Sequence, residues 1–282
     1  MRFHRLSVLL VALAVTAGAC SGDDEVDSSS PQAVLAAAPG KTIAEGTSRV
    51  AIDVSLSGEP ARRSVTGEGA FDFKGERGRL DLDLGPLLPS AGRAEILFSE
   101  DVVYLKVALG LPQLKKRPWL KIDLDELEKA GVGDIEALRQ LRTNDPKAAL
   151  NYLRGATGDV TREGEEVVRG VSTTRYRATV DLEKAKRAVD EELRGDLDQV
   201  RKQLGTNRLP VQAWIDGEGR LRRLRYTVDV STLDKSAPAR AAGTGEVSAA
   251  FELFDFGVGV DVAPPPADQT ITLQELLGGA AR

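Results

Sequence analysis

The side chains best suited to nucleophilic or metal chemistry lie in the first 20 residues of the chain. Cys20 is the only cysteine and His4 the only histidine among 282 residues. No disulfide can form within the chain, and the remaining sequence offers neither a thiol nucleophile nor an imidazole for general base catalysis or zinc binding. Carboxylates, lysine, serine and tyrosine could still catalyse a reaction, but no motif arranges them. The sequence predicts no catalytic residue, no metal site, no cofactor and no enzymatic activity.

Cys20 is preceded by the three zones of a secretion signal. Arg2 and Arg5 supply positive charge, residues 6–15 are almost entirely apolar, and small residues fill positions 17–19. The apolar run is shorter than the roughly 20 residues of a membrane-spanning helix. The segment before Cys20 resembles a bacterial lipobox, although Ala17 replaces the usual leucine or valine. The resemblance implies removal of residues 1–19, acylation of the Cys20 thiol, and anchoring at the outer face of the plasma membrane. The alternative is an ordinary cleaved signal followed by a chance cysteine.

Residues 20–31 are polar and rich in serine and acidic side chains, which predicts a flexible tether. Residues 32–282 are expected to form one domain. Loss of residues 1–19 removes two arginines and no acid, so the formal net charge of −5 becomes −7. Nucleic-acid affinity comes mainly from cations that neutralise phosphates, so this acidic chain is not expected to bind nucleic acid.

Alternation of apolar and polar residues predicts many antiparallel strands joined by glycine turns. It is clearest where Val50, Ile52, Val54 and Leu56 alternate with polar residues. The predicted strands are 50–56, 65–73, 80–84, 93–98, 102–107, 119–124, 159–162, 166–181, 209–216, 221–230 and 246–256, with the sheet ending at the prolines 264–266.

Helical periodicity predicts one long amphipathic helix over 182–204, capped by Gly205, which would cover a face of the sheet. Shorter helices are expected at 134–142, 147–154 and 273–277. A weak one at 31–45 would be divided by Pro39-Gly40. The acidic runs Glu165-Glu166 and 190–192 could suggest paired catalytic acids, but solvation explains the run 190–192. Trp119 and Trp214 are interpreted as packing residues, with a position at the cavity mouth as the alternative. The apolar loops 87–89 and 109–112 either fold inward or mark a rim where lipid enters. The cations 115–117 either form a solvated turn or meet anionic headgroups.

The order of these elements resembles a known family. A lipobox and tether precede a strand meander, an amphipathic helix, the hairpin Leu209-Pro210-Val211-Gln212-Ala213-Trp214-Ile215-Asp216-Gly217 and the closing Phe254-Asp255-Phe256-Gly257. This is similar to the LolA-like lipid-carrier lipoproteins of actinobacteria, the LppX/LprG group. The resemblance covers roughly residues 31–277. It implies an α+β fold, a half-open antiparallel β-barrel with covering helices that enclose an apolar cavity for acyl chains.

The resemblance implies a function without chemistry: binding a lipid or glycolipid and carrying it from the plasma membrane toward the outer envelope, with a membrane transporter as a candidate partner. An envelope sensor that binds a membrane protein is the alternative. Each apolar side chain that points inward could equally be ordinary core. The residues predicted to line the cavity are Val54, Leu56, Phe71, Phe73, Leu82, Leu84, Phe98, Leu105, Ile122, Leu193 and Leu197.

Overall fold

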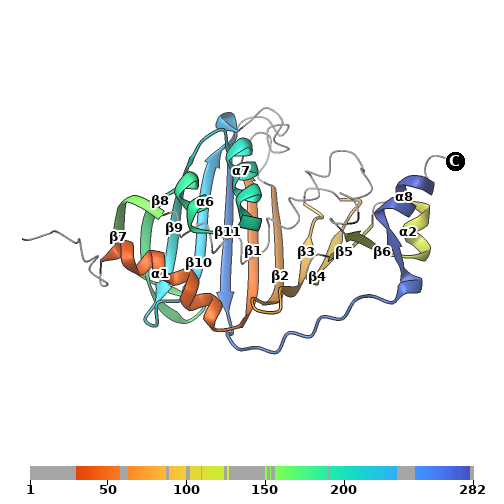
Figure 1. The fold of residues 1–282 in the computed structure, drawn as a ribbon, viewed down its shortest axis with the longest axis horizontal. Helices are drawn as coiled ribbons and strands as arrows, with labels where there is room; N and C mark the ends of the chain where they lie inside the picture. Colours follow the sequence, from red (N-terminus) through yellow and green to blue (C-terminus); the bar gives the residue numbers. More distant parts are fainter. Residues whose placement is uncertain are drawn as a thin grey trace, which may run out of the picture.

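The computed structural model describes residues 30–57, 63–86, 89–99, 102–108, 110–123, 126, 150, 153, 156–189, 191–233 and 245–279. Most of these residues belong to one sheet of 12 strands with helices packed against it (Figure 1). Cys20, most of the tether and nearly all of the predicted helices 134–142 and 147–154 lie outside the described residues. Leu150 and Leu153 are the described part of that region, and both are fully buried.

The strands form an open, largely antiparallel sheet. They are β1 (Thr47–Ser57), β2 (Arg63–Asp72), β3 (Arg77–Asp83), β4 (Arg93–Ser99), β5 (Val102–Val107), β6 (Trp119–Asp123), β7 (Ala156–Val168), β8 (Val171–Asp181), β9 (Arg208–Asp216), β10 (Leu221–Asp229), β11 (Glu246–Phe254) and β12 (Thr270–Thr272). Their order is β12-β6-β5-β4-β3-β2-β1-β11-β10-β9-β8-β7. β12 runs parallel to β6, and the other neighbouring pairs are antiparallel. The predicted open sheet with covering helices is confirmed.

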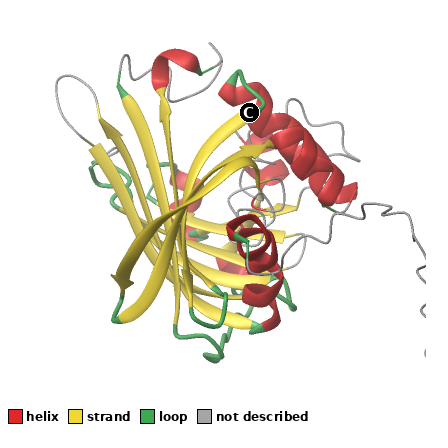
Figure 2. Cartoon of the chain, turned by 90° about the vertical axis from the view of Figure 1, so that its left-hand side faces the viewer, coloured by secondary structure: helices red, strands yellow, loops and turns green. Residues whose placement is uncertain are grey.

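The helices gather on one side of the curved sheet (Figure 2). They are α1 (Pro31–Ala44), α2 (Pro112–Lys116), α6 (Leu182–Ala188), α7 (Glu191–Leu204) and α8 (Leu273–Gly279), with 3-10 turns η2 (Val230–Thr232) and η4 (Ala267–Gln269). Within the described part of the chain, no helix combines the length and the apolar character that a membrane span needs.

Two helix predictions are corrected. α1 runs unbroken through Pro39, because Pro39 itself is buried along with Leu35 and Ala38, and this burial offsets the backbone hydrogen bond that proline cannot make. The predicted long helix is two helices, since Val189 adopts an extended backbone between α6 and α7 while its side chain remains buried. Gly205 ends α7 with a positive φ of 65°, as predicted.

Two strand predictions are also corrected. The segment 166–181 is the end of β7 and all of β8, because Arg169 and Gly170 form a tight turn with φ of 47° and 80°. Arginine seldom occupies such a position, so the turn has no clear sequence signal. The sheet does not end at the prolines: the chain after Pro266 adds β12 beside β6.

Two glycines allow β2 and β3 to approach closely. A Cβ atom at Gly69 would lie 1.9 Å from the carbonyl oxygen of Arg79, and one at Gly67 would lie 2.9 Å from the carbonyl oxygen of Asp81. Backbone atoms cannot move aside as the end of a side chain can, so any larger residue would separate the strands at this point. Both glycines lie near the middle of the sheet, next to β1.

Candidate functional site

The register of the strands gives the sheet one continuous apolar face. Across β11, β1, β2, β3, β4 and β5, aligned positions on this face carry apolar side chains or glycine, except Ser48 opposite Phe71 and Arg63 opposite Leu56. One such row is Phe251, Ile52, Gly67, Leu82, Ala94 and Val107. The helices cover this face, and the side chains between sheet and helices form the hydrophobic core. Because side chains alternate along a strand, the opposite face, the outer face, carries the charged residues.

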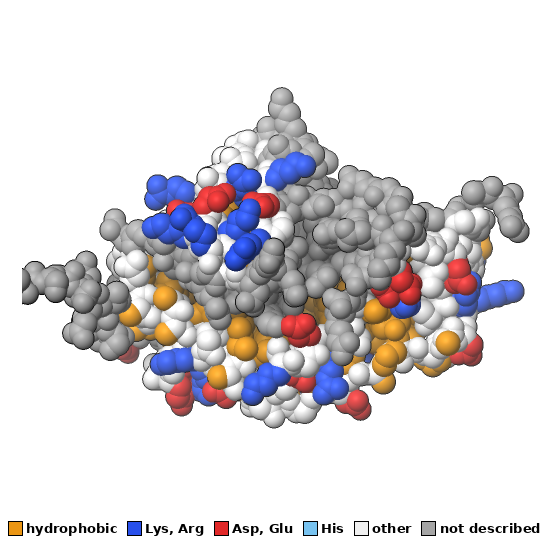
Figure 3. Space-filling model, viewed as in Figure 1, with side chains coloured by type: hydrophobic (Ala, Val, Ile, Leu, Met, Phe, Trp, Pro, Cys, Tyr) orange, Lys and Arg blue, Asp and Glu red, His pale blue; other side chains and the backbone are white. Residues whose placement is uncertain are grey.

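On β1, β3, β5 and β10, burial on the apolar face decreases toward one edge of the sheet, whereas Val180 of β8 and Leu209 of β9 stay buried at that edge. On β1, Val50 is 1% exposed and Val54 is half-buried; on β5, Val103 is 2% exposed and Leu105 is half-buried. The same change occurs from Leu80 to Leu82 on β3 and from Leu224 to Tyr226 and Val228 on β10. All of these half-buried side chains lie toward the edge where β1, β3, β5 and β10 end, which we call the mouth edge. The space-filling view, in which the mouth edge is uppermost as in Figure 1, shows hydrophobic side chains at the surface mainly in the lower half of the molecule, away from that edge (Figure 3).

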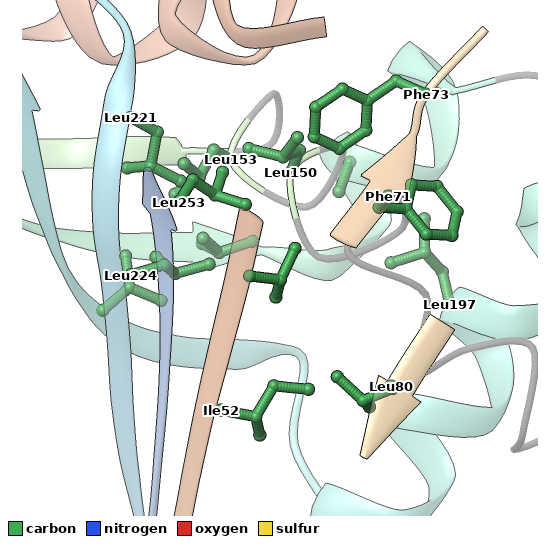
Figure 4. Packing of buried hydrophobic residues seen from close by; sticks show 14 of the residues in the cluster. Ile52, Phe71, Phe73, Leu80, Leu150, Leu153, Leu197, Leu221, Leu224 and Leu253 are labelled. Carbon is green, nitrogen blue, oxygen red and sulfur yellow. The ribbon is translucent and has the colours of Figure 1, made fainter. Parts of the chain in front are cut away.

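The opposite edge is closed by tightly packed aromatic and aliphatic side chains. The ring centroid of Phe71 lies 5.7 Å from that of Phe73 and 6.2 Å from that of Phe98. Leu197 of α7 faces this group across the core, near Phe71 and Leu80 (Figure 4). The apolar face is therefore sealed at one edge and incompletely covered at the mouth edge.

The structure brings most of the predicted cavity residues together. Val54, Leu56, Phe71, Leu82, Phe98, Leu105 and Ile122 share the apolar face by strand register. Phe73 lies just past β2 and is buried, Leu84 lies just past β3 and is half-buried, and Leu197 is buried on α7. The side chain of Leu193 lies outside the described part of the chain. Whether these residues contact a ligand stays a prediction.

Sequence reasoning missed equally well placed residues. Leu80, Ile96, Tyr226 and Phe251 lie on the same face, and their strand alternation could have identified them. Tyr226 and Phe251 stack with ring centroids 6.5 Å apart. Burial raises the pKa of Tyr226, so its phenol stays neutral and adds no charge to the apolar face.

The outer face is held by a ladder of alternating charges. Glu166 of β7 accepts hydrogen bonds from Trp214 Nε1 at 2.9 Å and Arg223 Nη1 at 3.3 Å. Arg223 Nε also donates to Glu252 at 2.8 Å, and Glu252 accepts from Arg169 Nε at 2.6 Å. Arg169 lies 3.8 Å from the centroid of the Phe254 ring. The ladder joins β7, β10 and β11 and fixes the β7–β8 turn to the middle of the sheet.

Ionised groups on this side of the structure are paired, and their pKa values reflect that. Burial raises the pKa of Glu252, but hydrogen bonds from Arg169 and Arg223 outweigh burial and lower it. Asp216, in the β9–β10 turn, behaves similarly: burial raises its pKa, and the backbone N–H of Arg220 with the Arg222 and Arg220 guanidinium groups lowers it overall. These carboxylates are stably ionised ion-pair partners, which makes them poor general acids or bases.

A hollow of about 820 Å³ lies on the outer face over β11, β1, β2 and β3. Its lining includes Asp53, Glu68, Asp81, Arg79 and Arg169, so an acyl chain would meet charged groups there. Among the described residues, no group of three or more histidine, cysteine, aspartate or glutamate side chains is placed to hold a metal ion. The apolar face, not this hollow, is the surface that fits an apolar ligand.

Both tryptophans lie away from the apolar face. Trp214 is 2% exposed beneath Arg223 and Arg225, and Trp119 is 7% exposed with Lys106 5.4 Å from its ring centroid. The interpretation of both residues as packing residues is confirmed. The described parts of the predicted rim elements fall at the mouth edge, where α2 occupies residues 112–116. Residues 87–88 and 109 lie outside the described part of the chain.

Comparisons with known proteins point to bacterial lipoproteins. No protein-family model matches the chain. It is 28% identical over 162 residues to a candidate lipoprotein of Streptomyces coelicolor, covering 57% of this chain and 44% of that protein. It is 26% identical over 168 residues to an uncharacterized 31.2 kDa protein of Streptomyces griseus, covering 57% of this chain and 51% of that protein. The matches thus span about half the length of these curated relatives.

Among solved structures, the lipoprotein LppX of Mycobacterium tuberculosis matches 81% of this chain and 98% of its own, with a TM-score of 0.44 and 15% identity. LprF of Mycobacterium bovis matches 84% of this chain and 97% of its own, with a TM-score of 0.41 and 16% identity. A LolA superfamily protein of Nitrosomonas europaea matches 84% of this chain and 94% of its own, with a TM-score of 0.30 and 12% identity. The chain is thus similar to actinobacterial lipoproteins and to proteins of the LolA superfamily, which is the resemblance that its sequence predicts.

Proposed function

We propose that this protein binds the acyl chains of a lipid or glycolipid on the apolar face of its sheet and carries them away from the plasma membrane toward the outer envelope. The observation that carries the proposal is the change in burial along the strands. On β1, β3, β5 and β10, apolar side chains are buried toward one edge and partly exposed toward the mouth edge. Exposed apolar side chains that converge on one edge are typical of a binding surface.

The energetics favour an acyl chain as ligand. Each methylene that leaves water contributes about 0.8 kcal/mol, so ten buried methylenes contribute roughly 8 kcal/mol before the costs of association. In the described part of the chain, the ion pairs of Arg169 and Arg223 with Glu166 and Glu252 lie on the outer face, so the apolar face presents mainly hydrocarbon to a ligand. The activity proposed is binding and transport, with no reaction catalysed.

The same proposal places the protein at the outer face of the plasma membrane through an acylated Cys20. Its support is the lipobox-like sequence at residues 17–20 and the similarity to a candidate lipoprotein of Streptomyces coelicolor. α1 begins at Pro31, capped by Ser30, whose hydroxyl accepts a hydrogen bond from the Ala33 N–H at 3.2 Å. Nine residues would then separate Cys20 from Ser30, and the ten Cα–Cα steps between the two reach about 35 Å when extended.

Native mass spectrometry of the full-length protein, purified from an actinobacterial host, tests this function. The proposal predicts discrete mass additions that extract into organic solvent as lipids with two or more acyl chains. A protein that carries no lipid contradicts the proposal. If crosslinking in cells then captured one membrane protein in fixed ratio, a sensor that binds that protein would replace the carrier.

A further inference from the structure

The short helix α2 is rigidly mounted at the mouth edge. It begins five residues after β5 ends there and leads directly into β6. Leu114 fixes α2 to the hydrophobic core and is 8% exposed. Arg117 follows the helix and donates from Nη1 to the carbonyl oxygen of Thr270 at 3.3 Å and to Glu275 of α8 at 3.0 Å. α2 and α8 lie together at the end of the molecule farthest from β7 (Figure 1).

The outward side of α2 combines apolar and cationic side chains. A helical turn places residues 111, 112, 115 and 116 on one side and residues 113, 114 and 117 on the other. Burial follows this division: Leu111, Pro112, Lys115 and Lys116 are exposed, while Leu114 is buried. Leu111 is 38% exposed, one of two large hydrophobic side chains exposed in the described part of the chain. Neither Lys115 nor Lys116 forms an ion pair with a described residue.

We propose that this outward side of α2 docks on the surface of a bilayer that contains anionic lipid. Lys115 and Lys116 contact the anionic headgroups, and Leu111 inserts at the level of the headgroups and upper acyl chains. Paired lysines beside an exposed apolar side chain match the chemistry of that interface, where the lysine stems lie along apolar material and the ammonium groups stay in the headgroup layer. An acidic protein partner would satisfy the lysines but leaves Leu111 without an apolar counterpart unless it also offers a pocket.

Docking by α2 brings the mouth edge next to the bilayer. Leu105 and Val107, the half-buried side chains of β5, lie a few residues before α2 on the same chain. A lipid that leaves the bilayer beside α2 therefore meets the incompletely covered end of the apolar face first. This last step rests on the proposed function, whereas the docking of α2 does not.

The experiment uses the full chain with Leu111→Trp, reconstituted in vesicles whose acyl chains carry bromine, which quenches indole fluorescence on contact. Trp119 and Trp214 are buried, so bromine in the bilayer does not reach them and the parent protein supplies a constant, unquenched background. We expect the emission of the introduced indole to be quenched in phosphatidylglycerol vesicles and not in phosphatidylcholine vesicles. Adding Lys115→Gln and Lys116→Gln is expected to lower the ratio of docked to undocked protein roughly 30-fold, since each lysine near an anionic surface contributes about fivefold.

The matched control is Lys184→Gln with Lys202→Gln, which removes the same charge from exposed positions of α6 and α7. It is expected to leave the quenching intact. Docking by α2 is overturned if the introduced indole is not quenched in phosphatidylglycerol vesicles, if phosphatidylcholine vesicles quench it equally, or if the control loses as much quenching as the Lys115/Lys116 variant. A failure of the carrier function would look different. The introduced indole would still be quenched, but native mass spectrometry would find no lipid bound to the protein.

Discussion

Replacing half-buried leucines of the apolar face should weaken acyl-chain binding, while replacing their outer-face neighbours should not. Leu82 on β3 and Leu105 on β5 are half-buried near the mouth edge. Fully burying a leucine contributes about 1.5–3 kcal/mol, and at most about a third of each of these side chains is exposed, so covering that part with an acyl chain contributes about 0.5–1 kcal/mol. Leu82→Ala with Leu105→Ala then removes roughly 1–2 kcal/mol of binding free energy, which is a loss of about 5- to 30-fold in affinity.

The strands provide a matched control one position away. Asp81 and Lys106 are neighbours of these leucines and point to the outer face, where they form exposed ion pairs with Arg79 at 3.2 Å and Glu95 at 3.7 Å. Exposed ion pairs contribute little to stability, so Asp81→Ala with Lys106→Ala should leave affinity within about twofold. Titration of a fluorescent fatty acid measures both variants, after circular dichroism confirms that each is folded. Equal affinity of the leucine variant and the parent, or an equal loss in the control, refutes the assignment of the apolar face as the binding surface.

Three further predictions concern stability. The pKa values of Asp216 and Glu252 are lowered in the folded protein, so the stability that these carboxylates provide is complete above their unfolded pKa values, 3.8 and 4.5. That stability is lost as the pH falls through their folded pKa values, and urea unfolding between pH 6 and pH 3 should show the decline. A free energy of unfolding that stays constant over that range contradicts this expectation. Gly69→Ala should lower the free energy of unfolding by about 1–3 kcal/mol, because the added methyl group clashes with β3. Gly40→Ala, which has open space around it in α1, should raise the free energy of unfolding by about 0.5–1 kcal/mol. The interpretation of Gly69 is wrong if chemical denaturation shows the same sign for both changes. Arg169→Ala should lower the free energy of unfolding by about 1–3 kcal/mol and raise the pKa of Glu252, because Glu252 loses a hydrogen bond from the guanidinium group. The acid unfolding transition should then shift to higher pH, and an unchanged transition would exclude this role of Arg169.

The sequence predicts the sheet well because its signals are local. Alternation in β1 identifies both the strand and its apolar face, and the Asp216-Gly217-Glu218-Gly219 turn marks the β9–β10 hairpin. The same alternation gathers most of the predicted cavity residues, since antiparallel register carries one face from strand to strand.

The features that sequence reasoning misses depend on contacts between distant segments. The division of α6 from α7 at Val189 gives no signal, because the apolar stripe continues across it. β12 is three residues long and is defined by pairing with residues of β6 that lie 151 positions earlier in the chain. The charge ladder from Glu166 to Glu252 joins residues far apart in sequence, so each charge looks like ordinary solvated surface until the sheet is assembled. Local chemistry predicts the strands, and tertiary pairing decides the rest.

The proposed function depends on the binding of acyl chains to the apolar face. Photolabelling tests it most directly, with a fatty acid that carries a diazirine on its chain, crosslinked to the full-length protein and mapped by peptide mass spectrometry. We expect labels on apolar-face residues toward the mouth edge, such as Val54, Leu82, Leu105 and Phe251. These labels should disappear when unlabelled lipid competes for the same surface. Labels confined to the outer face, or spread evenly without competition, would contradict it.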